Sequence, residues 1–192
     1  MNNRQQYTLA AALIVFTVLV RMLTYTNHIG NFAPLVAMSL FVGSRFGNKQ
    51  LAYIVPLFAA LLSDICLGIF TTQTGFYGMS QVVNYLAYFA VVALGTQLRT
   101  ITIPRVGAFT LGGAVVFFLI SNFSTFIDTT YNMYPKTLSG LAACYAAGLA
   151  FVRTQVEQNW LLNEVSGHFI FAAFFFGIYA LATKTATRKQ LA

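Results

Sequence analysis

Asp64 has the clearest capacity for chemistry in this sequence, because it places a carboxylate inside the apolar run LAYIVPLFAALLSDICLGIF, residues 51–70. An unpaired charge inside a membrane helix costs about 2.5–3.5 kcal/mol on insertion scales, so such a side chain should face protein or water. Arg21 lies near the end of the first apolar run. Two interpretations stay open: an Arg21–Asp64 ion pair, or contact between Asp64 and a ligand.

Three other polar side chains stand near the same predicted side of the molecule. Asn84 lies near the start of one apolar run, Asn122 near the end of the next, and His168 near the start of the last. A single buried Asn or His is more typical of a hydrogen bond between helices than of a ligand site. Their shared depth, among many aromatic residues, favours a cavity for a flat organic molecule, since such sites combine apolar walls with few polar groups.

Signatures of enzymes and metal sites are absent from the sequence. It contains no H-E-x-x-H, G-x-S-x-G or P-loop pattern, and its two His and two Cys do not show metal-ligand spacing. We therefore predict no enzymatic activity, no metal and no cofactor. Without a P-loop, any ATP-driven transport needs a motor from other chains. An intramembrane enzyme that pairs Asp64 with His168 is the least favoured hypothesis.

The composition indicates a polytopic membrane protein. Of 192 residues, 58% are hydrophobic and 8% are charged, whereas soluble domains contain roughly 25% charged residues. The formal charge is +7, but the basic residues are scattered between apolar runs. A nucleic-acid-binding arm would cluster them, so no nucleic-acid partner is predicted, and the basic residues serve as topology signals.

Charged loops predict the direction of each span. Apolar segments occur at about residues 8–26, 32–46, 50–70, 79–97, 107–126, 138–152 and 165–183. Basic residues precede the first segment, at Arg4, and occupy alternate loops, at Arg45 and Lys49 and at Arg99 and Arg105. Because Lys and Arg collect in short cytoplasmic loops, the N-terminus is predicted to be inside.

A basic C-terminal tail places the C-terminus inside as well, which requires an even number of crossings. One of the seven segments therefore does not cross, and 138–152 is the best candidate because it is short and rich in Gly and Ala. We expect it to be re-entrant or partly inserted, packed against protein. The predicted fold is an all-α integral membrane protein with six transmembrane helices in a single domain, 1–192, with an outer-face cap at 123–164.

Four stretches carry a resemblance to a known family. They are NFAPLVAMSLFVGSRFG (31–47), LAYIVPLFAALLSDICLGIF (51–70), FFLISNF (117–123) and MYPKTLSGLAACYAAGLAF (133–151). Together they cover about half of the chain. The chain resembles the S components, the substrate-capturing subunits of energy-coupling factor vitamin transporters, and is most similar to an uncharacterised group of bacterial six-helix proteins related to them.

The resemblance implies a six-helix bundle with both termini inside and a substrate pocket at the outer face. It also implies delivery of the substrate to a transmembrane coupling subunit driven by two ATPases. The matching positions on the outer side are Asn31, Asp64, Asn122, Tyr134 and Cys144. The chain departs from the pattern at the last helix, where His168 follows Gly167 in place of Asp, which changes the ligand chemistry expected there.

The sequence thus favours a membrane-embedded solute-binding subunit for uptake of a small organic, vitamin-like molecule, in contact with membrane lipid. The location implied is the bacterial inner, or cytoplasmic, membrane, with several spans and cytoplasmic termini. The alternative is a structural or assembly protein of the inner membrane that uses the same fold. The predicted substrate contacts are Asn31, Asp64, Asn84, Asn122, Tyr134 and His168.

Overall fold

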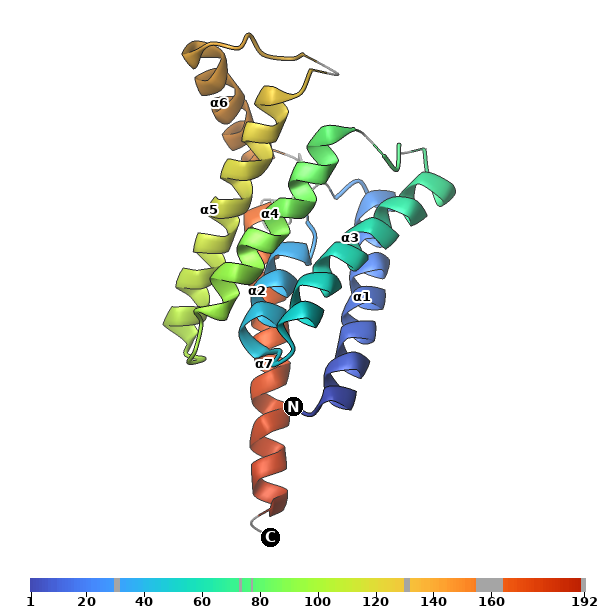
Figure 1. The fold of residues 1–192 in the computed structure, drawn as a ribbon, viewed down its shortest axis with the longest axis vertical. Coiled ribbons are helices and arrows are strands. Elements are labelled where there is room, and N and C mark those ends of the chain that lie inside the picture. Colours follow the sequence, from blue (N-terminus) through green and yellow to red (C-terminus); the bar gives the residue numbers. More distant parts are fainter. Residues whose placement is uncertain (30–31, 73, 77, 130–131, 155–163, 191–192) are drawn as a thin grey trace.

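The computed structural model describes residues 1–29, 32–72, 74–76, 78–129, 132–154 and 164–190, with only the backbone described for 150–154 and 184–190. Helices make up the regular structure of these ranges (Figure 1). They are α1 (Asn3–Thr26), α2 (Leu35–Arg45), α3 (Lys49–Phe70), α4 (Met79–Thr96), α5 (Ile103–Ile127), α6 (Leu138–Thr154) and α7 (Glu164–Gln190).

Five of these helices are long and apolar enough to cross a membrane: α1, α3, α4, α5 and residues 164–183 of α7. Each has at least 18 residues, or about 27 Å at 1.5 Å per residue. The all-helical class is confirmed, and five such helices indicate a membrane-embedded protein. The other two predicted segments form shorter helices, α2 and α6.

The short helix α2 forms the centre of the bundle. All nine residues from Leu35 to Gly43 are buried, and α2 packs against α3, α4, α5 and α7. The closest packing is with α4, where a Cβ on Gly43 would lie 2.3 Å from the Val92 carbonyl oxygen and one on Gly95 would lie 2.5 Å from that of Leu40. Glycine at both positions therefore lets the two backbones touch, the usual means of close helix packing in membranes.

Hydrogen bonds define a lower end of the bundle, where Figure 1 places both chain termini. Arg45 Nη2 donates to the carbonyl oxygens of Leu98 (2.6 Å) and Arg99 (3.2 Å). Gln6 Oε1 accepts from the Asn48 backbone N–H (3.0 Å). The two predicted basic loops therefore lie together, beside the start of α1.

Other contacts define the opposite, upper end. The Tyr25 and Thr72 hydroxyl oxygens lie 3.1 Å apart, which joins the ends of α1 and α3. Ser80 Oγ donates to the Asp128 carboxylate (2.9 Å), which joins the start of α4 to the end of α5. The loops predicted to be outer are thus grouped at one end, as the charge pattern indicates.

The non-crossing segment predicted at 138–152 forms most of α6, which packs on α5. Figure 1 shows α6 beside the upper part of α5 only. The outer-face cap predicted at 123–164 stays a prediction, and its first residues belong to α5, which continues to Ile127. Its polar residues, including Asn122 and Ser124, are thus part of a continuous helix, whose backbone carbonyls they can use as acceptors.

Candidate functional site

The Arg21–Asp64 ion pair forms in the structure, between α1 and α3 of the upper half. Arg21 Nη1 lies 2.7 Å from Asp64 Oδ1, and the two side chains are 21% and 7% exposed. Arg21 also donates to the Ser63 hydroxyl and to the Ala60 carbonyl oxygen (3.4 Å). Of the two interpretations drawn from the sequence, the ion pair is the one whose geometry is present.

Two side chains of α4 complete the surroundings of this carboxylate. Gln81 Nε2 donates to Asp64 Oδ2 at 2.8 Å, and Tyr85 donates its hydroxyl to the same oxygen at 2.6 Å. Gln81 Nε2 also lies 2.9 Å from the carbonyl oxygen of Gly75, in the loop between α3 and α4. A charge in this setting is paired and fully hydrogen-bonded, so the cluster holds α1, α3 and α4 together.

Sequence reasoning did not single out Gln81 or Tyr85. The signal that could have found them is their spacing of four residues, which puts both side chains on one face of a helix. A glutamine near the start of an otherwise apolar run also requires a polar partner. What the sequence does not give is the partner, because Asp64 lies across a loop from both residues.

Asn122 lies at the α5–α6 interface, away from the Asp64 cluster along the sequence and in its contacts. Its Nδ2 donates to the Phe118 carbonyl oxygen one turn earlier (2.9 Å). A Cβ on Gly148 would lie only 2.1 Å from Asn122 Oδ1, so α6 approaches this carboxamide closely. The Cys144 thiol donates to the Asn122 carbonyl oxygen (3.3 Å). Asn122 therefore contributes to the docking of α6.

The thiol of Cys144 is buried and is held in its protonated form. Its residue is 1% exposed, and burial raises the pKa of the thiol, against an opposing effect of Lys136. Next to it, Tyr145 donates its hydroxyl to the Leu119 carbonyl oxygen (2.8 Å). Cys144 stays protonated at neutral pH and acts here as a packing residue and weak donor.

His168 lies on α7, 4% exposed. Its Nε2 is 3.8 Å from Glu164 Oε1, one turn earlier on the same helix. Within the described residues, its buried Nδ1 has no hydrogen-bond partner. A buried imidazole nitrogen without a partner is costly, so this atom differs from the satisfied carboxylate of Asp64.

The remaining predicted contacts are placed as follows. Asn84 is half-buried on α4, with its carboxamide oxygen enclosed by protein. Tyr134 is half-buried in the connection between α5 and α6. Asn31 lies outside the described residues. The described part of the chain also holds no group of three or more His, Cys, Asp or Glu side chains placed to bind a metal ion.

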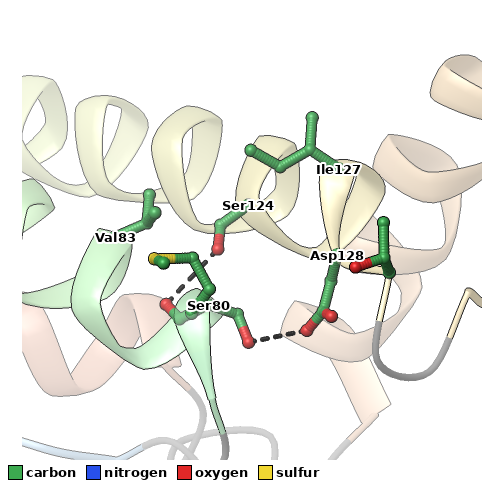
Figure 2. Close-up of a pocket in the computed structure, with 7 residues that line it drawn as sticks. Ser80, Val83, Ser124, Ile127 and Asp128 are labelled. Carbon is green, nitrogen blue, oxygen red and sulfur yellow. Dashed lines mark hydrogen bonds between the residues drawn. The ribbon is translucent and has the colours of Figure 1, made fainter.

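A small cavity lies between the upper ends of α4 and α5 (Figure 2). Its volume is about 110 Å³, and its walls include Ser80, Ser124 and Asp128. The Ser124 hydroxyl donates to the Ser80 carbonyl oxygen (3.3 Å), beside the Ser80–Asp128 bond. Pockets for drug-sized ligands are about 300–1,000 Å³, so this cavity suits a few water molecules rather than an organic solute.

Comparison with known protein families assigns the chain to a family. A model of the family DUF6580, described as a family of unknown function, matches residues 1–191, so the chain belongs to this family. No curated protein and no solved structure matches the chain.

Proposed function

We propose that this member of the DUF6580 family is a membrane-embedded subunit that captures a small organic, vitamin-like solute from the outer face for uptake. The observation that carries the proposal is the position of α2. This helix has 11 residues, or about 16 Å, whereas the hydrocarbon core of a bilayer is about 30 Å thick. α2 is nevertheless buried in the centre of the bundle.

The described residues just before α2, 32–34, are not helical, so a crossing that includes them has non-helical backbone at membrane depth. Such backbone is tolerated only where it is buried in protein or lines a water-filled cavity. In transporters, interrupted helices of this kind form substrate sites near the middle of the membrane. We therefore propose that the segment before α2 and α2 itself make the sixth crossing, and that the solute binds around the start of α2.

The charge distribution supports an orientation with the start of α2 facing outward. Arg45 and Lys49 follow α2, and Arg45 contacts the loop that carries Arg99, at the same end as the termini. By the positive-inside rule this end is cytoplasmic, in the inner membrane of a bacterium. We further propose, from the resemblance to S components, that a transmembrane coupling subunit with its ATPases supplies the energy.

The predicted contacts have different roles in this proposal. Asp64 positions the wall made by α1, α3 and α4, because its oxygens are occupied by Arg21, Gln81 and Tyr85. Asn122 holds α6 in place. His168 is the best candidate for direct contact, and we retain Asn31, Asn84 and Tyr134 as further candidates.

The proposal is tested by purifying the full chain in a mild detergent and identifying the small molecules that stay bound by mass spectrometry. We expect one organic solute at a near-stoichiometric amount, and we expect that solute, added back, to raise the melting temperature of stripped protein. If no solute copurifies and none of a panel of water-soluble vitamins and their precursors raises the melting temperature, the proposal is wrong. A stoichiometric protein partner without any solute would favour the assembly-protein alternative.

A further inference from the structure

The first turn of α2 has three buried backbone donors that find no acceptor in the described part of the chain. Leu35, Val36 and Ala37 are 2%, 3% and 0% exposed. The residue before them is Pro34, whose side chain cannot cap a helix, and the first backbone bond is from Met38 N–H to the Pro34 carbonyl (2.8 Å). No described residue accepts from the three earlier N–H groups. Helix ends buried without partners are rare, because each unpaired donor is costly.

His168, whose buried Nδ1 has no partner among the described residues, lies at the level of this helix start. Gly167 lies against the ring of Phe32, to which a Cβ would come within 3.0 Å, and Phe32 packs on Phe171 with ring centroids 5.1 Å apart. Phe32 is two residues before Pro34. His168 shares the buried face of α7 with Phe171, a face that packs on α2 further down. His168 is therefore the polar group of α7 at the level where the chain enters α2.

These groups together have the chemistry of an anion site. The start of a helix carries about half a positive charge and directs its free N–H groups outward. The Glu164 carboxylate lies on the Nε2 side of His168, which leaves Nδ1 as the nitrogen available to a ligand. With a proton on Nδ1, His168 supplies a fourth donor in addition to the three backbone N–H groups.

The size of the charge favours a carboxylate over a phosphate. The helix start supplies about half a positive charge and the Glu164 carboxylate beside His168 adds a negative one, so the site suits an anion with one negative charge better than one with two. A phosphate monoester carries about 1.5–2 negative charges at pH 7, which this low-dielectric site would leave partly uncompensated.

We propose that the N-terminus of α2 and His168 bind the carboxylate group of the captured solute. This inference rests on the proposed function, since it names the class of solute: a small water-soluble carboxylic acid. His168 is a binding residue in this proposal, and the α2 N–H groups supply the rest of the carboxylate contacts.

The direct test uses sodium acetate, the simplest stable carboxylate probe, on stripped full-length protein labelled with ¹⁵N in its histidine rings. The chain has two histidines, and the second, His28, is exposed on the α1–α2 connection and serves as an internal reference. We expect acetate to shift the His168 Nδ1 resonance saturably and leave His28 unchanged. Acetamide, sodium chloride and inorganic phosphate at matched concentration and ionic strength should have little effect.

Variants provide a second measurement. His168→Phe should weaken acetate binding at least tenfold, His168→Gln should retain part of it through its N–H donor, and His28→Phe should leave it unchanged. The inference is wrong if acetate moves neither histidine, if it moves both equally, or if acetamide acts as well as acetate. Because the titration uses the unmodified chain, it decides the question even if a His168 variant does not fold.

The two proposals fail in distinguishable ways. If the solute identified by mass spectrometry has no carboxylate, or stays equally bound in His168→Gln protein, the capture function stands and the carboxylate site is wrong. If no solute is found and no panel compound binds, the capture function is wrong. A long-chain fatty acid as the bound species would show a lipid source and overturn the assignment of a water-soluble acid.

Discussion

The two ends of α2 differ in whether their backbone groups are hydrogen-bonded to the rest of the protein. At the lower end, Lys49 Nζ donates to the carbonyl oxygens of Gly43 (3.2 Å) and Phe46 (3.1 Å). The Ser44 hydroxyl donates to the Phe41 carbonyl oxygen (2.9 Å). At the upper end, the N–H groups of residues 35–37 find no acceptor among the described residues.

This difference distinguishes polar groups that are already hydrogen-bonded within the protein from polar groups that are available to a ligand. A helix end whose backbone groups are hydrogen-bonded by side chains needs no ligand. An end with unpaired backbone N–H groups gains hydrogen bonds only when another group binds there. The Arg21–Asp64 cluster lies in the same upper half and yet is closed. Depth in the membrane therefore does not separate the two regions, whereas their hydrogen bonding does.

The largest loss of stability is expected when the Asp64 carboxylate is removed from its cluster with Arg21. Asp64→Ala leaves Arg21 without its partner and should lower the free energy of unfolding by about 3 kcal/mol, since breaking a buried ion pair is strongly destabilising. Thermal unfolding of detergent-solubilised protein, followed by size-exclusion chromatography with fluorescence detection, measures this loss. The double variant Arg21→Met, Asp64→Leu should recover most of it.

A result in which Asp64→Ala keeps full stability but loses solute would reverse this comparison. It would place Asp64 among the ligand contacts, as one interpretation of the sequence allowed. The Asp64→Asn variant helps to separate the two cases, because its amide oxygen can still accept from Tyr85.

A smaller effect is expected from the middle of α2. Gly43→Ala puts a methyl group where the Val92 carbonyl oxygen lies 2.3 Å away, and should cost about 2 kcal/mol through forced separation of α2 and α4. The matched control is Gly177→Ala, because a Cβ there meets nothing within 4 Å. Equal melting temperatures for the two variants would contradict the close α2–α4 packing.

Removing the Lys49 hydrogen bonds at the lower end of α2 should cause a smaller loss of stability. Lys49→Met removes two hydrogen bonds from a charged but solvent-exposed donor, so we expect a loss of about 1 kcal/mol. Lys49→Arg, which keeps donors and charge, should stay near the wild type. The acetate response of His168 should be the same in all three proteins; a lost response in Lys49→Met would show that the two ends are not independent.

The smallest effect is expected at the cavity between α4 and α5. Ser80→Ala removes the hydrogen bond to Asp128 and should cost about 0.5 kcal/mol, because water can enter the cavity and replace the hydroxyl. Solute copurification should not change, and Thr129→Val, on the same cavity wall, is the companion variant. Loss of the solute in either protein would extend the binding site to this cavity.

Much of the fold could be predicted from the sequence, because apolar length and basic loops are local signals. Residue depth indicated the Arg21–Asp64 pair as one of two interpretations, and the structure contains that pair. Small-residue spacing is a less informative signal: small residues stand four apart both at Ala59 and Ser63, which are buried, and at Ala143 and Ala147, which are exposed. Composition shows that a helix can pack closely but not which of its faces does so.

The open end of α2 could not be predicted in this way. Hydropathy extends from residue 32 to 46, and nothing in it shows that the helix begins at Leu35, inside the bundle. Pro34 is consistent with a helix start. Whether the donors that follow it are satisfied depends on α7, which lies more than 120 residues later in the chain.

The glycine contacts between α2 and α4 also bear on mechanics. Because Gly43 lies on Val92 and Gly95 on Leu40, backbone against backbone, the two helices have no side-chain layer across which to slide. We expect them to move as one rigid body during any transport cycle. Opening and closing would then depend on helices that pack through side chains, such as α7, whose phenylalanines can exchange rotamers as it shifts across this fixed pair.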